Sequence, residues 1–303
     1  MEFLSPSQLN AYEPPPGLVL AGDNHLVRGS VFVLGGPPGV GKSRATVALA
    51  EAGAMRSDWF GLPVHTPFRT LIVQNENGRY RLKQEFAQRD GLALEDYVRV
   101  TPPPPYGLCF HRAEFRDQLA AQIESFDPAV VVIDPWSAAV RDDKAKEYLE
   151  AFDAIRRVIP AGDAGPAVGI VAHTRKPHAG ERASGRALLH LLAGSHVLGA
   201  VPRCAFVLQS ASDEVTETRV VWTCCKNNDG ELGPRSAWER ADGRFEPVSD
   251  FDWQAFDFPE AGKEAGITPA QVGAVFREGH LKLPRSVAVK RRQELTGRKK
   301  TLC

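Results

Sequence analysis

Short apolar runs alternate with helix-like stretches through residues 31–172. Four runs rich in β-branched residues are bounded by turn-forming or polar residues and predict strands; they cover residues 31–34, 70–73, 130–133 and 167–172. Residues 147–159 place apolar side chains at helical spacing, which predicts a helix with one buried face. Strands that alternate with helices are typical of an α/β fold with a mainly parallel central sheet.

The pattern changes after about residue 200, where turn-forming sequences such as Asp229-Gly230 separate the apolar runs. Three of these runs predict antiparallel strands that extend the sheet, at residues 204–208, 219–223 and 236–239. Two short helices are predicted near the end of the chain, at 267–276 and 286–295. We therefore expect a proline-rich N-terminal arm (1–29), a core (30–248), and a linker followed by a small helical appendage (249–303).

Composition excludes several classes of protein. The chain has 303 residues, of which 43% are hydrophobic and 24% charged, so it is neither disordered throughout nor fibrous. Its longest apolar runs fall short of the ~18 residues of a membrane helix, and no export-signal pattern opens the chain, so we expect no membrane partner. Five cysteines without a Cys-x-x-Cys pair suggest neither a disulfide framework nor a zinc site, and a cytoplasmic location is predicted.

Basic and acidic residues are equal in number, 37 each, but they are unevenly distributed. Residues 277–300 hold nine basic and two acidic side chains, so the charge is +7 there and −7 over the remainder. This distribution excludes a protein surface that is basic throughout. It leaves room for nucleic-acid contact at the basic end.

The most specific motif is G-x-x-x-x-G-K-S, from Gly36 to Ser43, between a predicted strand and a predicted helix. Its glycines allow backbone N–H groups to surround phosphates, Lys42 supplies a charge to the β- and γ-phosphates, and the Ser43 hydroxyl is placed to ligate Mg²⁺. The motif therefore predicts binding of ATP with Mg²⁺. The predicted contact residues are Gly36, Pro37, Pro38, Gly39, Val40, Gly41, Lys42, Ser43 and Arg44.

Two acids follow neighbouring predicted strands. Asp134 ends the run 130–133, as in a Walker B motif, and is predicted to hold the Mg²⁺ with Ser43. Glu76 follows the run 70–73, where a carboxylate could orient and deprotonate an attacking water. The alternatives are a buried strand that happens to end in an acid and a solvated loop glutamate.

With these residues the chain resembles the RecA-like ATPases, and among them the branch that contains the hexameric plasmid replicative helicase RepA. The resemblance covers roughly residues 15–245. Its ordered motifs are the phosphate loop, Gly61-Leu-Pro-Val64, Glu76, Asp134-Pro135, His173 and Lys226-Asn227-Asn228. It implies a RecA-like P-loop NTPase fold.

The resemblance also implies catalytic roles. Glu76 would be the general base, and His173 the sensor that contacts the γ-phosphate, with a structural strand-end histidine as the alternative. A lysine and an arginine from the next subunit complete the site in this family. Lys226 matches the lysine and Arg203 is the candidate arginine, whereas some relatives carry an arginine at the position of Asn228.

Two basic segments are candidates for single-stranded DNA contact. The loop after His173 holds Arg175, Lys176, Arg182 and Arg186, and a further loop spans residues 139–146. The tail, with Lys290 and Arg291, resembles a shortened helix-turn-helix appendage. Solvated loops and a basic terminus without a partner are equally compatible with these residues.

Together these features predict an ATP-hydrolysing protein that assembles as a ring, such as a hexamer, and acts on single-stranded DNA as a helicase or translocase in replication or mobile-element maintenance. The alternative is a nucleotide-switched regulatory or scaffold ATPase without motor activity, which the asparagine at 228 favours. A small-molecule kinase is disfavoured, because the β-rich region after residue 200 stands where such kinases carry a helical lid.

Overall fold

The computed structural model describes residues 3–142, 144–160, 162–176 and 183–258. The chain divides into two compact units, residues 1–249 and 250–303, of which the second is described only over residues 250–258 and holds α8 (Trp253–Asp257). The predicted helices 267–276 and 286–295, and the candidate residues Arg182, Lys290 and Arg291, lie outside the described residues.

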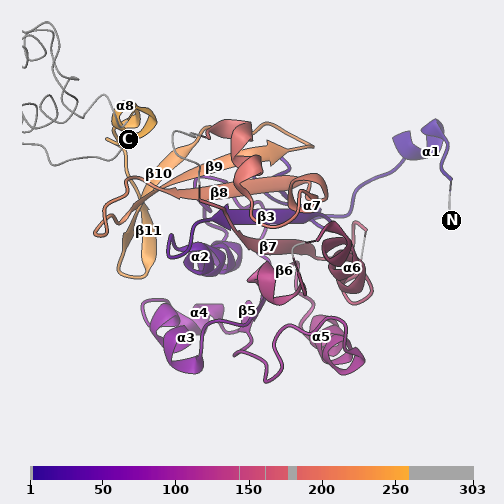
Figure 1. The fold of residues 1–303 in the computed structure, drawn as a ribbon. Coiled ribbons are helices and arrows are strands. Elements are labelled where there is room, and N and C mark those ends of the chain that lie inside the picture. The colour runs from indigo at the N-terminus through magenta and orange to yellow at the C-terminus, as the bar shows by residue number, and fades with distance from the viewer. Residues whose placement is uncertain (1–2, 143, 161, 177–182, 259–303) are drawn as a thin grey trace, which may run out of the picture. The chain divides into compact units, whose positions relative to one another are not determined.

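Nine strands of the described residues form one sheet in the order β11-β10-β9-β8-β3-β7-β6-β4-β5 (Figure 1). Six of them are parallel: β3 (Val31–Gly36), β4 (Thr70–Gln74), β5 (Val98–Val100), β6 (Val130–Asp134), β7 (Ala167–His173) and β8 (Cys204–Ser210). Three antiparallel strands continue the sheet beyond β8: β9 (Arg219–Asn227), β10 (Ser236–Ala241) and β11 (Arg244–Pro247).

Helices cover the parallel part of the sheet and create two hydrophobic clusters. Successive residues of a strand point to opposite faces of the sheet. In β6, Val132 therefore packs in the cluster on the face covered by α2 (Lys42–Met55). Ile133 packs in the cluster on the other face, which α5 (Ala113–Phe126) and α6 (Ala145–Arg156) cover. The shorter helical segments are α1 (Pro6–Asn10), α3 (Arg79–Phe86), α4 (Gly91–Leu94), η1 (Trp136–Ala138), η2 (Gly185–Leu191) and α7 (Val197–Ala200).

The predicted strands and the α/β class are confirmed, but two details differ from expectation. The run 204–208, expected as the first antiparallel strand, forms β8, which is parallel to β3, so the antiparallel extension begins at β9. The N-terminal part also differs. Residues 19–27 form a hairpin of β1 (Val19–Ala21) and β2 (Leu26–Val27), and its Leu20, Ala21 and Leu26 are buried in the core. Each strand is too short to show a period in the sequence. Because this hairpin belongs to the core, the segment outside the core is shorter than the expected arm. Within the described part of the chain, no helix is long and apolar enough to cross a membrane.

Candidate active site

The candidate groups meet because four adjacent strands end at one edge of the sheet. The order β3-β7-β6-β4 places the phosphate loop, His173, Asp134 and Glu76 side by side along this edge. Strand register brings Gly36 opposite His173, and Gln74 opposite Asp134. In open α/β sheets, ligands bind outside the carboxyl ends of the strands, and this is such a position.

The phosphate loop requires its glycines. Gly39 and Gly41 have φ angles of 76° and 106°, which side chains disfavour. A Cβ at Gly41 would also lie 3.2 Å from Cδ of Arg240, and one at Gly36 would lie 2.9 Å from the carbonyl of Leu208. Helix α2 begins directly at Lys42, so its N-terminal N–H groups face the loop.

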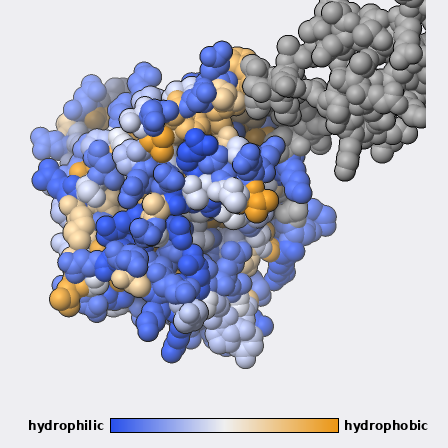
Figure 2. All heavy atoms as spheres, turned by 90° about the vertical axis from the view of Figure 1, so that its left-hand side faces the viewer, coloured by the Kyte–Doolittle hydropathy of each residue, from blue (hydrophilic) through white to orange (hydrophobic). Residues whose placement is uncertain are grey.

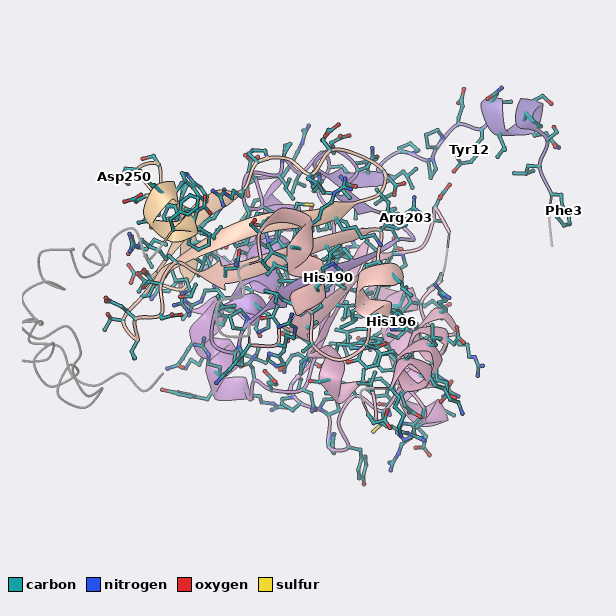
Figure 3. The ribbon with its side chains drawn as sticks, turned by 45° about the horizontal axis from the view of Figure 1, so that its top comes forward. Phe3, Tyr12, His190, His196, Arg203 and Asp250 are labelled. Carbon is teal, nitrogen blue, oxygen red and sulfur yellow. The ribbon has the colours of Figure 1, made fainter. Side chains whose placement is uncertain are left out.

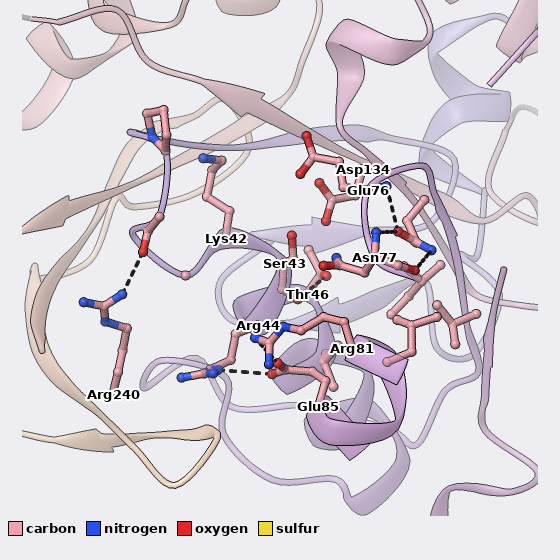
Figure 4. Close-up of a pocket in the computed structure, with 18 of the residues that line it drawn as sticks. Lys42, Ser43, Arg44, Thr46, Glu76, Asn77, Arg81, Glu85, Asp134 and Arg240 are labelled. Carbon is pink, nitrogen blue, oxygen red and sulfur yellow. Dashed lines mark hydrogen bonds and ion pairs between the residues drawn. The ribbon is translucent and has the colours of Figure 1, made fainter. Parts of the chain in front are cut away.

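Lys42 is buried at the centre of the site (Figure 4). Its Nζ donates to the carbonyl oxygens of Gly36 and Pro37, both at 2.9 Å, and lies 3.2 Å from Nδ1 of His173. Burial lowers the pKa of Lys42 to about 8, against the opposing attraction of Asp134 and Glu76. Burial and the neighbouring Lys42 lower the pKa of His173.

Asp134 and Ser43 form the candidate magnesium site. Asp134 is 3% exposed, and burial raises its pKa to about 6, although a hydrogen bond with Ser43 lowers it. A hydroxyl and a carboxylate in contact are hard oxygen ligands of the kind that Mg²⁺ prefers. These residues therefore fit the cation that accompanies ATP in P-loop sites.

Glu76 is positioned by Gln74, which the motif analysis missed. The Oε1 atom of Gln74 accepts hydrogen bonds from the backbone N–H groups of Glu76 (3.0 Å) and Asn77 (2.7 Å). Its Nε2 donates to the carbonyl of Thr101 at 2.6 Å. Gln74 is 2% exposed, so the loop is anchored in the core while the Glu76 carboxylate faces the cavity beside Asp134 (Figure 4).

The cavity has a volume of about 530 Å³ and reaches from the phosphate loop to α3. At the α3 end, Glu85 accepts from Nε of Arg44 at 3.1 Å and pairs with Arg81 at 2.8 Å. The side chain of Arg44, a predicted nucleotide contact, is thus held by a carboxylate at the cavity wall.

Arg240 is a second residue that sequence reasoning missed, because β10 carries no recognisable motif. Its guanidinium donates to the carbonyl of Gly39 at 2.7 Å and to those of Thr218 and Glu217 at 3.1 and 2.7 Å. It thereby ties the tip of the phosphate loop to the turn before β9.

We expect Arg240→Ala to weaken ATP binding about tenfold, because a hydrogen bond from a charged group to the loop tip is worth ~1.5 kcal/mol. Calorimetric titration with a non-hydrolysable ATP analogue measures this change. Arg244→Ala is the matched control, since Arg244 is on the same hairpin and pairs instead with Glu51. Equal affinities for both variants would contradict the assigned role.

Lys226 and Arg203 lie away from this cavity. Arg203 donates its backbone N–H to Val31 at the start of β3, whereas the phosphate loop follows the end of that strand. Its guanidinium pairs with Asp229 at the edge of the molecule (Figure 3), and Nζ of Lys226 donates to Gly199 and Ala200 at 2.9 and 3.1 Å. Burial lowers the pKa of Lys226, and the positive charge of the nearby Arg203 lowers it further.

The described part of the loop after His173 lies near the site. Arg175 is half-buried and its backbone N–H donates to Leu191 at 2.7 Å, whereas Lys176 and Arg186 are exposed. Their role in DNA contact stays a prediction.

The strand order, the phosphate loop and the acids along one edge define a RecA-like P-loop ATPase. A family model described as an AAA domain matches residues 2–179, and the chain belongs to this family. The crystal structure of a KaiC-like protein from the hyperthermophilic archaeon Pyrococcus horikoshii shares the fold, with a TM-score of 0.53, 14% identity, and coverage of 78% of this chain and 95% of that one. A comparison with curated proteins gives no significant match. The predicted family is thereby confirmed.

Proposed function

We propose that the protein hydrolyses ATP and that a cytoplasmic ring of its copies couples this reaction to movement on single-stranded DNA, in replication or mobile-element maintenance. The observation that carries the proposal is the convergence of Lys42, Asp134, Glu76 and His173 on one cavity. This set contains a phosphate-binding cation, a carboxylate for the metal, a second carboxylate for water, and an imidazole.

Each residue has a distinct task. The phosphate loop and Lys42 hold the β- and γ-phosphates, and Lys42 exchanges its carbonyl partners for phosphate oxygens. Mg²⁺ at Ser43 and Asp134 would neutralise phosphate charge. Glu76 accepts the proton of the attacking water. Gln74 anchors the Glu76 loop and so holds the carboxylate at the cavity. His173 contacts Lys42 and begins the basic loop, so a change at the phosphate reaches that loop.

We further propose that Lys226 and Arg203 act on a neighbouring copy. They lie at the opposite edge of the sheet from their own phosphate loop, so they face the cavity of another copy only in a head-to-tail arrangement. Such heterologous contacts close into rings when the rotation permits.

Mixing two inactive variants tests this arrangement. Lys226→Ala chains keep Glu76, and Glu76→Gln chains keep Lys226. In an equal mixture, about a quarter of the heterologous interfaces join a cavity with Glu76 to a neighbour with Lys226, so the mixture should recover about a quarter of the wild-type ATPase rate. Arg156→Ala, which removes an exposed arginine paired with Asp153, should stay active alone. A mixture as inactive as its components would contradict action between copies.

A nucleotide-switched regulatory or scaffold ATPase is the second candidate. It is supported by the internal partners of Lys226 and Arg203 and by the asparagine at position 228. This function predicts slow turnover that does not respond to DNA.

A further inference from the structure

Helix α3 buries a charged side chain where helices usually bury apolar ones. Glu85 is 8% exposed, whereas Leu82 and Phe86 are half-buried and the remaining residues of the helix are exposed. Figure 2, which views the side of the molecule where Figure 1 labels α3 and β11, shows a mainly hydrophilic surface. Burial of a carboxylate costs free energy unless charged partners compensate it. Glu85 therefore depends on its ion pairs.

Three arginines supply the compensating charge. Nε of Arg44 donates to Oε1 of Glu85 at 3.1 Å, and Nη2 of Arg81 lies 2.8 Å from Oε2 (Figure 4). Nη1 of Arg89 lies 3.9 Å from Oε1. Arg81 and Arg89 are each four residues from Glu85 along the same segment. Of the three pairs, the one with Arg44 therefore joins α3 to a different element, α2.

This ion pair connects the two halves of the candidate active site. Arg44 is in the first turn of α2, directly after Ser43 of the phosphate loop. Glu85 is in the helix that begins at Arg79, three residues after Glu76. The pair thus fixes the distance between the phosphate loop and the segment that carries the candidate general base.

Residues 75–84 have an anchor at each end. Before the segment, Gln74 accepts from the backbone N–H groups of Glu76 and Asn77 at 3.0 and 2.7 Å. After it, Glu85 pairs with Arg44. The residues between the anchors are exposed or half-buried. Because a segment with few buried contacts opens readily, the two anchors determine where the Glu76 carboxylate lies.

We propose that Glu85 is a positioning residue for ATP hydrolysis, and that its ion pair with Arg44 holds the Glu76 segment against the phosphate loop. The inference rests on the proposed role of Glu76 in activating water. Glu85 lines the α3 end of the cavity and acts on the reaction through the segment. The pair should therefore affect kcat and leave ATP binding intact.

Separate measurement of kcat and ATP affinity tests the role of Glu85. Glu85→Gln keeps the shape of the side chain, and we expect it to lower kcat about 10- to 100-fold, the loss that a misplaced catalytic group causes. ATP affinity should not weaken, because the change removes a negative charge beside a site for an anion. Lys83→Gln, at an exposed position of α3, is the control and should match the wild type. A wild-type kcat in Glu85→Gln, or a loss of affinity equal to the loss of kcat, would overturn the proposal.

A double substitution tests the ion pair itself. Arg44→Gln should lower kcat at saturating ATP by a factor similar to that of Glu85→Gln. The chain with both substitutions should lose no more than either single variant, because each change removes the same pair. Losses that multiply would show that the two residues act separately, and the proposal would be wrong.

Amide hydrogen exchange over residues 75–84 distinguishes this inference from the proposed function. Without nucleotide, the segment should exchange faster in Glu85→Gln than in the wild type or in Lys83→Gln. Unchanged exchange would refute the anchor whether or not the protein hydrolyses ATP. Faster exchange in Glu85→Gln, combined with a wild-type chain that does not hydrolyse ATP, would support the anchor and refute the proposed function.

Discussion

Replacing Glu76 with glutamine is expected to lower the rate of ATP hydrolysis by a factor of about 10² to 10⁴, the usual contribution of a positioned general base. Glutamine has the same shape but accepts a proton poorly. The backbone hydrogen bonds from Glu76 and Asn77 to Gln74 stay intact, so the loop should keep its position. ATP affinity should change little, because the carboxylate acts on water and not on the phosphate loop.

Steady-state phosphate release and binding of a fluorescent ATP analogue measure the two effects separately. Glu124→Gln, an exposed glutamate on α5, serves as the control and should behave like the wild type. Full turnover in Glu76→Gln would show that another group activates the water.

Asp134→Asn is expected to abolish Mg²⁺-dependent hydrolysis and yet to stabilise the protein at pH 7.5. Folding raises the pKa of this carboxyl from 3.8 to about 6, so the native state binds the proton more tightly than the unfolded state. The stabilisation of the native state by this tighter proton binding is complete below about pH 4 and is lost as the pH rises through 6. At pH 7.5 the wild type therefore carries a buried charge, and removing it should add about 1–3 kcal/mol to the free energy of unfolding.

Thermal unfolding in EDTA at pH 7.5 and pH 5 checks the sign. The variant should melt higher than the wild type at pH 7.5, and the difference should shrink at pH 5, where Asp134 is mostly protonated. For the same reason, the apparent Mg²⁺ affinity of the wild type should fall about tenfold for each pH unit below 6. A stability difference that does not depend on pH would contradict the buried charge as its cause.

The sequence alone predicted the parts of the site that local motifs encode. The phosphate loop has fixed spacing, and Asp134 and Glu76 directly follow apolar runs that periodicity reveals. The carboxyl ends of parallel strands share one edge, so their convergence follows from the strand assignments. Which strands are neighbours, and the register that pairs Gln74 with Asp134, came only from the structure.

The supporting residues could not be predicted because their contacts are not local. Arg240 reaches Gly39 across a separation of 201 residues, and nothing in β10 marks that arginine for the phosphate loop. Glu85 is a polar residue in the short, mostly polar α3, yet three arginines surround it. The positions of Lys226 and Arg203 relative to the cavity likewise depend on the full sheet order.

The central claim is that copies of this chain assemble to hydrolyse ATP on single-stranded DNA. The most direct measurement is the ATPase rate with and without single-stranded DNA, together with the particle mass by light scattering in the presence of ATP and Mg²⁺. We predict a rate that DNA increases and a mass of several chains. A monomer whose turnover does not respond to DNA would contradict the account.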